Sequence, residues 1–184
     1  MEIIVRVSFL LGGVVLLLTW SRTRERPLNY FLLKRLDLKA RLISLVILAI
    51  GALQFLGIFD FKFPGQGSTF AALVSILGLF NFWIGVFLAS FGKITLGSNW
   101  DPESNHRPLV IQGAYRICRH PIYIGGLWAA FGGEIALQSF FALAVIPGIF
   151  LLNRACKDEE AALLKHFGEA YKAYRKRTKR FIVI

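Results

Sequence analysis

Long uncharged stretches constrain the fold of this chain more than any other feature. Residues 42–59 and 70–91 contain no charged side chain, and residues 3–20 contain only Arg6. A helix of each length, at about 1.5 Å per residue, crosses most of a roughly 30 Å hydrocarbon layer. A fourth apolar region, residues 122–152, is compatible with one long span or with a hairpin of two short ones. The pattern is typical of an integral membrane protein.

The composition excludes other classes. The chain has 184 residues and a formal net charge of +11, yet 55% of its residues are hydrophobic, only 18% are charged, and mean hydropathy is +0.57. A soluble nucleic-acid-binding protein carries far more charge, and a disordered chain lacks so many apolar residues. The two cysteines, Cys118 and Cys156, form neither a disulfide framework nor a zinc motif, so we expect small core residues.

The distribution of positive charge predicts a topology. Of the 22 basic residues, 20 lie in residues 21–41, residues 92–121 and the tail from Arg154 onward. The positive-inside rule places all three segments in the cytoplasm. A single fourth span would leave the nine-charge tail outside, whereas a hairpin turning at Gln138-Ser139 keeps it inside.

We therefore expect an all-α integral membrane protein, with residues 1–184 forming a single membrane domain, the N-terminus outside and the C-terminus in the cytoplasm. Five transmembrane helices are predicted, the last two forming a tight hairpin, over residues 3–20, 42–59, 70–91, 122–137 and 139–153. A cytoplasmic amphipathic C-terminal helix is expected over Lys157–Lys179, interrupted at Gly168, because apolar residues recur there at helical spacing among basic ones.

The predicted hairpin indicates where chemistry is concentrated. Its two ends carry Arg119, His120 and Tyr123 on one side, and Arg154, Glu159 and Glu160 on the other. A tight hairpin brings these groups together at the cytoplasmic surface. Both signs of charge, a ring nitrogen and aromatic walls suit a zwitterion with an aromatic appendage. The sequence contains neither a Rossmann fingerprint nor a P-loop.

Structural interpretations compete with this functional one. His120, followed by Pro121, is compatible with a simple cap at a helix start. Glu159 and Glu160 are equally compatible with a solvated acidic segment that favours a helix dipole.

The motifs also resemble a known family. Gly113-x-Tyr115-x3-Arg119-His120-Pro121-x-Tyr123, followed by Glu159-Glu160-x6-Phe167-Gly168-x2-Tyr171-x2-Tyr174, is similar to the membrane methyltransferase superfamily of isoprenylcysteine carboxyl methyltransferases and phospholipid N-methyltransferases. The stretch Leu96-Gly97-Ser98-Asn99-Trp100 also looks like that family's loop. The resemblance covers about residues 92–181.

The resemblance implies S-adenosylmethionine as cofactor, methyl transfer at the cytoplasmic face, and a lipophilic acceptor, either an isoprenylcysteine-type carboxylate or a phospholipid amine. It implies membrane lipids as neighbours, no nucleic acid and no metal. Its catalytic candidates are Arg154, which would orient the acceptor, and Glu159. Its cofactor-binding candidates are Gly113, Tyr115, Arg119, His120, Pro121, Tyr123, Glu159 and Glu160, the two glutamates addressing the methionine end.

Two alternatives remain open at this point. A similar C-terminal pattern occurs in sterol reductases that use NADPH, although those chains are much longer. A non-catalytic membrane protein is the other alternative, and it predicts no affinity for either cofactor.

Overall fold

The computed structural model describes residues 1–22, 53–54, 67–97 and 108–181, and within those ranges it contains helices and no strand. This confirms the all-α prediction for the described part of the chain. The elements are α1 (Glu2–Arg22), α4 (Thr69–Leu96), α5 (Ala114–Ile117), α6 (Pro121–Ala136), the 3-10 helix η1 (Phe140–Ala144), α7 (Val145–Phe167) and α8 (Glu169–Arg177).

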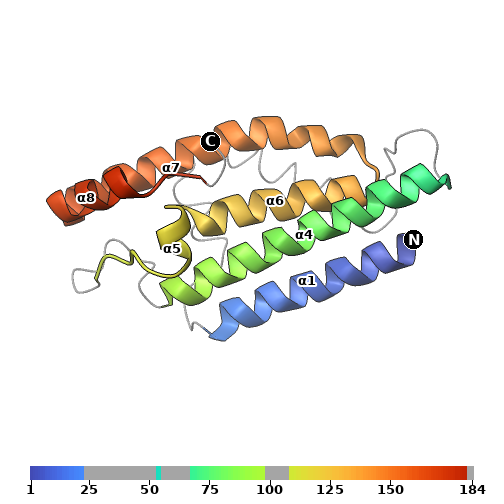
Figure 1. Ribbon diagram of the computed structural model, residues 1–184, viewed down its shortest axis with the longest axis horizontal. Coiled ribbons are helices and arrows are strands. Elements are labelled where there is room, and N and C mark those ends of the chain that lie inside the picture. The colour runs from blue at the N-terminus through green and yellow to red at the C-terminus, as the bar shows by residue number, and fades with distance from the viewer. Residues whose placement is uncertain (23–52, 55–66, 98–107, 182–184) are drawn as a thin grey trace.

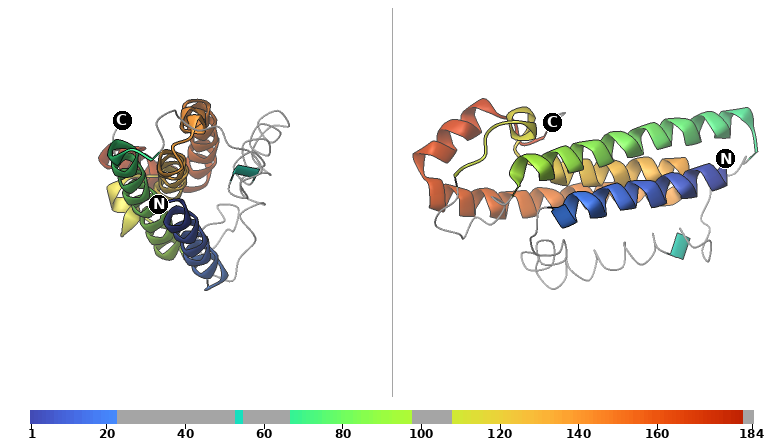
Figure 2. Two further views of the ribbon diagram at one scale, coloured as in Figure 1. Left: turned by 90° about the vertical axis from the view of Figure 1, so that its right-hand side faces the viewer. Right: turned by 90° about the horizontal axis from the view of Figure 1, so that it is seen from below.

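The long helices lie side by side along the long axis of the molecule (Figures 1 and 2). Helix α6 lies between α4 and α7, and α1 covers α4 from the other side. The rings of Phe9 on α1 and Phe82 on α4 pack with centroids 4.8 Å apart. The N-terminus lies at one end of the molecule, while α5 and α8 lie at the other.

Three helical segments in the described part are long and apolar enough to cross a membrane: Glu2–Thr19, Thr69–Leu96 and Phe140–Phe167. They fit a membrane protein. The predicted span 42–59 lies outside the described residues except for Leu53 and Gln54. Helix α6 has 16 residues, or about 24 Å, which is short for a full crossing. The five-span count and its orientation therefore stay predictions.

Glycines let α4 and α6 touch backbone to backbone. Gly78 and Gly85 of α4 face α6, and Gly125 and Gly132 of α6 face α4. A Cβ atom built on Gly85 would lie 2.6 Å from the carbonyl oxygen of Gly125 and 2.7 Å from Cα of Ala129. No side chain fits there, so these glycines set the spacing of the two helices. In lipid, where apolar side chains gain little from burial, such close packing is what holds helices together.

The chain turns between α6 and η1, where the predicted hairpin has its turn. Gln138 has a positive φ of 56°, and its side-chain amide donates to the carbonyl of Ala71 and to the hydroxyl of Ser75 on α4. The Ser139 hydroxyl caps η1 by accepting from the Phe141 amide. The turn is thus fastened to α4, and α7 runs back alongside α6 (Figure 1).

The last long helix is not divided as expected. We expected a separate amphipathic helix after the last span, but α7 continues without a break from Val145 to Phe167. The end of the span at residue 153 stays a prediction. Residues 154–167 are mostly good helix formers and contain neither glycine nor proline, so nothing ends the helix where the charges begin. The predicted interruption at Gly168 is confirmed, because this residue has a φ of 53° and separates α7 from α8.

Candidate functional site

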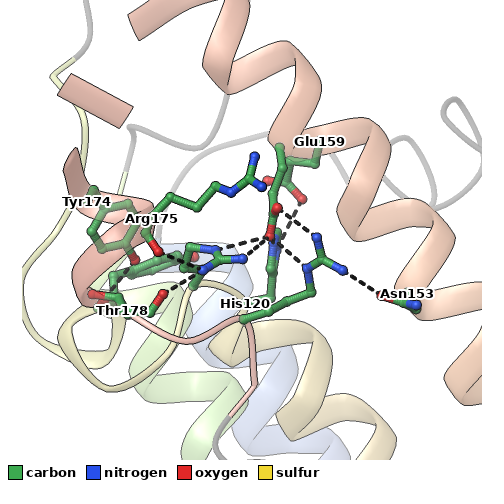
Figure 3. A network of polar contacts seen from close by, with 10 residues as sticks. His120, Asn153, Glu159, Tyr174, Arg175 and Thr178 are labelled. Atoms are coloured by element: carbon green, nitrogen blue, oxygen red, sulfur yellow. Dashed lines mark hydrogen bonds and ion pairs between the residues drawn. The ribbon is translucent and has the colours of Figure 1, made fainter. Parts of the chain in front are cut away.

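Three segments meet at the end of the molecule that is remote from the N-terminus. They are the approach to α6, the middle of α7, and the tail that follows α8 (Figures 1 and 3). Pro121 opens α6, and its fixed φ suits that first position. His120 precedes it as the N-cap residue, but its side chain makes no capping hydrogen bond. His120 thus occupies the capping position that the structural interpretation gave it, but its ring does not cap the helix and instead faces Glu160 of α7.

Glu160 is the centre of a buried polar network. Its side chain is only 3% exposed. Its Oε1 accepts from Nε and Nη2 of Arg119, at 3.1 and 2.9 Å, and lies 3.2 Å from Nε2 of His120. Arg180 reaches the same carboxylate through both arms of its fork, with Nε and Nη2 each 2.8 Å from an oxygen (Figure 3). The predicted meeting of Arg119 and His120 with the acidic pair is thus confirmed.

Arg119 also fastens the tail. Its Nη1 donates to the carbonyl oxygens of Arg175, at 3.3 Å, and of Thr178, while its main-chain N–H donates to the carbonyl of Lys179 at 2.9 Å. The last turn of α8 thereby gains donors for carbonyls that no longer have an intrahelical partner. With the carbonyls of Arg175 and Thr178 and the carboxylate of Glu160 as acceptors, four of the five N–H groups of the guanidinium are hydrogen-bonded within the protein.

Glu159 has a different environment from Glu160. Its Oε2 lies 3.7 Å from Nδ1 of His120, beyond hydrogen-bonding distance, and this oxygen is buried with no hydrogen-bond partner in the described part of the chain. A buried carboxylate oxygen without a donor is costly. The His120 ring therefore lies between two carboxylates, and only Glu160 has its hydrogen bonds satisfied by the protein.

Aromatic side chains surround the histidine. The ring centroids of Tyr123 and Phe181 lie 5.6 and 6.4 Å from that of His120. Tyr123, Cys156 and Phe181 form a buried apolar cluster, which confirms Cys156 as a small core residue. Cys118 is also fully buried.

Tyrosines form the wall on the α8 side. The Tyr174 hydroxyl donates to the carbonyl of Tyr115 at 2.7 Å, while the buried Tyr171 hydroxyl has no hydrogen-bond partner in the described part. Burial, assisted by the charge of Glu159, raises the pKa of Tyr115 well above its ordinary value. Burial likewise raises the pKa of Tyr171. Both phenols therefore stay neutral at physiological pH and can donate a hydrogen bond.

The remaining candidates have distinct positions. Gly113 turns the chain into α5 with a φ of 56°, where a Cβ would lie 2.6 Å from the Thr95 side chain. Arg154 lies on α7 with an exposed side chain, in contrast to the buried Glu160.

Four residues of the site were not predicted from the sequence: Asn153, Thr178, Arg180 and Phe181. Arg180 is one of nine basic residues from Arg154 onward, and no local signal distinguishes it from the others.

The site lies within a region that matches a known family. The model of the phospholipid methyltransferase family matches residues 68–170, which is more than half of the chain. The chain belongs to this family. The match includes the approach to α6 and both glutamates, and it ends before the tail that carries Arg180.

Curated relatives of this family member carry one name. Protein-S-isoprenylcysteine O-methyltransferase of Rattus norvegicus is 32% identical over 114 residues, which cover 56% of this chain and 39% of the rat protein. The protein of that name from Xenopus laevis is 28% identical over 111 residues, covering 56% of this chain and 38% of the relative. The chain thus matches about two fifths of the length of these relatives.

Proposed function

We propose that this chain is an integral membrane methyltransferase that uses S-adenosylmethionine to methylate a lipophilic acceptor at the cytoplasmic face. Family membership and the names of the relatives support transfer of a methyl group. The observation that carries the cofactor assignment is the buried, unpartnered Oε2 of Glu159 beside Nδ1 of His120. The unpartnered carboxylate oxygen calls for a cationic donor, and the α-ammonium of S-adenosylmethionine has that chemistry.

The residues present fit this cofactor in their chemistry. Glu159 and Nδ1 of His120 would hold the ammonium group, while Tyr115 and Tyr123 would offer aromatic faces to the adenine or the sulfonium. Gly113 and Pro121 shape the segments that approach it. Arg119 and Glu160 pair with each other beside His120, and Arg180 pairs with the same carboxylate. When bound, the cofactor supplies a methyl group made electrophilic by the sulfonium.

The chemistry asked of the protein is mainly alignment and exclusion of water. A carboxylate acceptor needs no base, and Arg154 would orient it by pairing with its charge. An amine acceptor must lose a proton, so a glutamate or histidine of the site would have to serve as base. We favour the carboxylate of an isoprenylcysteine-type acceptor, because the curated relatives carry that name.

Binding tests the cofactor assignment directly. The full chain in lipid nanodiscs is titrated calorimetrically with S-adenosylmethionine. Glu159→Gln should weaken binding about tenfold, because an amide loses the charge that makes the hydrogen bond strong. Glu169→Gln is the matched control, since Glu169 is an exposed α8 glutamate that pairs with Lys172. Equal affinity of both variants would remove Glu159 from the site.

Transfer from labelled cofactor then identifies the acceptor. A farnesylated cysteine derivative with a free carboxylate should become labelled, and phosphatidylethanolamine in vesicles should not. Labelling of the phospholipid alone would move the assignment to an amine. Tighter binding of NADPH than of S-adenosylmethionine would favour the reductase alternative, and binding of neither would favour a non-catalytic protein.

A further inference from the structure

The tail beyond α8 folds back over the site. We call residues 178–181 the C-terminal strap. It is held at its start by Arg119, which donates to the carbonyls of Thr178 and Lys179, and at its end by Phe181, which packs on Tyr123 and Cys156. Between these two points, Arg180 reaches Glu160 and Asn153 of α7. The strap therefore touches both arms of the hairpin, and it lies beyond the part of the chain that matches the family.

Arg180 joins the strap to α7 by three hydrogen bonds. Its fork grips Glu160 with two N···O distances of 2.8 Å, and its Nη1 donates to Oδ1 of Asn153 at 2.8 Å. Bidentate pairing fixes orientation as well as distance. The Arg180 side chain is 24% exposed and that of Glu160 only 3%, so Arg180 closes the network on its solvent side.

The orientation of Glu160 determines what His120 can do. A carboxylate only accepts hydrogen bonds, so the Nε2 atom that faces Glu160 at 3.2 Å carries the ring hydrogen. In a neutral ring, Nδ1 is then an acceptor and faces Glu159. Two acceptors side by side make a binding place for a donor. The position of Glu160 that gives this arrangement is held by four N–H groups, two from Arg119 and two from Arg180.

We propose that Arg180 is a positioning residue of this site: through its pair with Glu160 it holds the C-terminal strap beside His120, keeps the ring hydrogen on Nε2, and thereby leaves Nδ1 and Glu159 as a paired acceptor for the ammonium of the methyl donor. The part concerning the donor rests on the proposed function. The part concerning His120 does not.

Histidine NMR of the full chain in nanodiscs tests the proposal without any turnover. The sequence has only three histidines, His106, His120 and His166, so a His120→Gln spectrum assigns the ring signals. The unmodified chain should show hydrogen on Nε2 of His120. Arg180→Gln should produce a mixture of both ring forms. Arg177→Gln, the matched control, removes an equal charge from an exposed position at the end of α8 and should leave the His120 signals unchanged.

Calorimetry on the same variants tests the consequence. Arg180→Gln should weaken S-adenosylmethionine binding about tenfold, as expected from the loss of one charged hydrogen bond at the ligand. Arg180→Lys, which keeps the charge but not the fork, should recover part of the affinity. Asn153→Ala removes one of the three bonds of Arg180 and should have an intermediate effect on both readouts. If Arg180→Gln does not fold, Asn153→Ala replaces it as the test of the positioning role.

The outcomes separate the two proposals. Unchanged His120 signals in folded Arg180→Gln, or in Asn153→Ala if the former is unfolded, overturn the positioning role. Equal effects of Arg177→Gln and Arg180→Gln also overturn it, because charge alone would then explain them. If the unmodified chain does not bind S-adenosylmethionine, the proposed function fails, while the ring signals still decide the role of Arg180.

Discussion

Replacing Gly85 with alanine tests whether the contact between α4 and α6 sets the geometry of this protein. The added methyl group would meet the backbone of α6: the carbonyl oxygen of Gly125 at 2.6 Å, Cα of Ala129 at 2.7 Å, and the Ala129 nitrogen. These atoms belong to a helix backbone and cannot rotate away. The two helices must move apart by on the order of 1 Å to restore an ordinary contact.

The cost follows from that separation. Overpacking a well-packed interface costs roughly 1–3 kcal/mol, and a rigid obstacle places this substitution at about 3 kcal/mol. A gap of 0.5–1 Å also forfeits about a quarter to a half of each dispersion contact, so neighbouring close contacts at Gly78 and Gly132 weaken too. Gly126→Ala is the matched control. Its Cβ meets nothing within 4 Å on the same pair of helices, and it should stabilise α6 by roughly 0.5–1 kcal/mol.

The assay is thermal unfolding in detergent micelles, followed by circular dichroism. For a chain of this size, about 3 kcal/mol corresponds to a fall in Tm of roughly 6–12 °C for Gly85→Ala, against a small rise for Gly126→Ala. The reasoning is refuted if the two variants melt within about 2 °C of each other, a difference worth about 1 kcal/mol or less. The helices would then be held by something other than this close approach.

Three further substitutions test other parts of the structure. Glu160→Gln should lower the free energy of unfolding by about 3–5 kcal/mol, because Arg119 and Arg180 lose their buried partner. Glu159→Gln should change the free energy of unfolding by less than about 1 kcal/mol. Equal denaturant midpoints of the two variants would contradict this. Phe181→Ala should cost about 3 kcal/mol and expose Cys156 to maleimide in a Cys118→Ser background; unchanged labelling would show that the strap does not cover this thiol. Gly168→Ala should lower the stability of the protein by about 1 kcal/mol, because Gly168 has a positive φ. Gly13→Ala, in open space within α1, should raise the stability. A melting temperature of Gly168→Ala at or above that of Gly13→Ala would contradict this.

Part of the site could be predicted because chain connectivity determines it. A turn at Gln138-Ser139 brings the two ends of residues 122–152 together, and the structure places Arg119 and His120 against Glu160. The sequence could not show which glutamate each partner meets. Consecutive residues of a helix point about 100° apart, so the division between Glu159 and Glu160 depends on how α7 is rotated against α6. That rotation is a property of packing.

Two other features depend on information that is not local. The pattern of charges indicates where a helix leaves the apolar layer, but it does not indicate where the helix ends, which explains why the expected separate helix after residue 153 is part of α7. Arg180 contacts Asn153, which is 27 residues away, through a non-helical segment. It is one of several basic residues in the same tail, so its role becomes visible only when the tail is seen to fold back.

The unbroken course of α7 has a mechanical consequence. The apolar residues at the start of α7, from Val145 onward, and the two glutamates belong to one continuous helix. A helix adapts to bilayers of different thickness chiefly by tilting. Any tilt of the apolar half of α7 must swing its other half through the same angle, and Glu159 with it, relative to His120 at the start of α6. The lipid composition of the host membrane would then adjust the gap between the two acceptors, without any ligand that binds at the site itself.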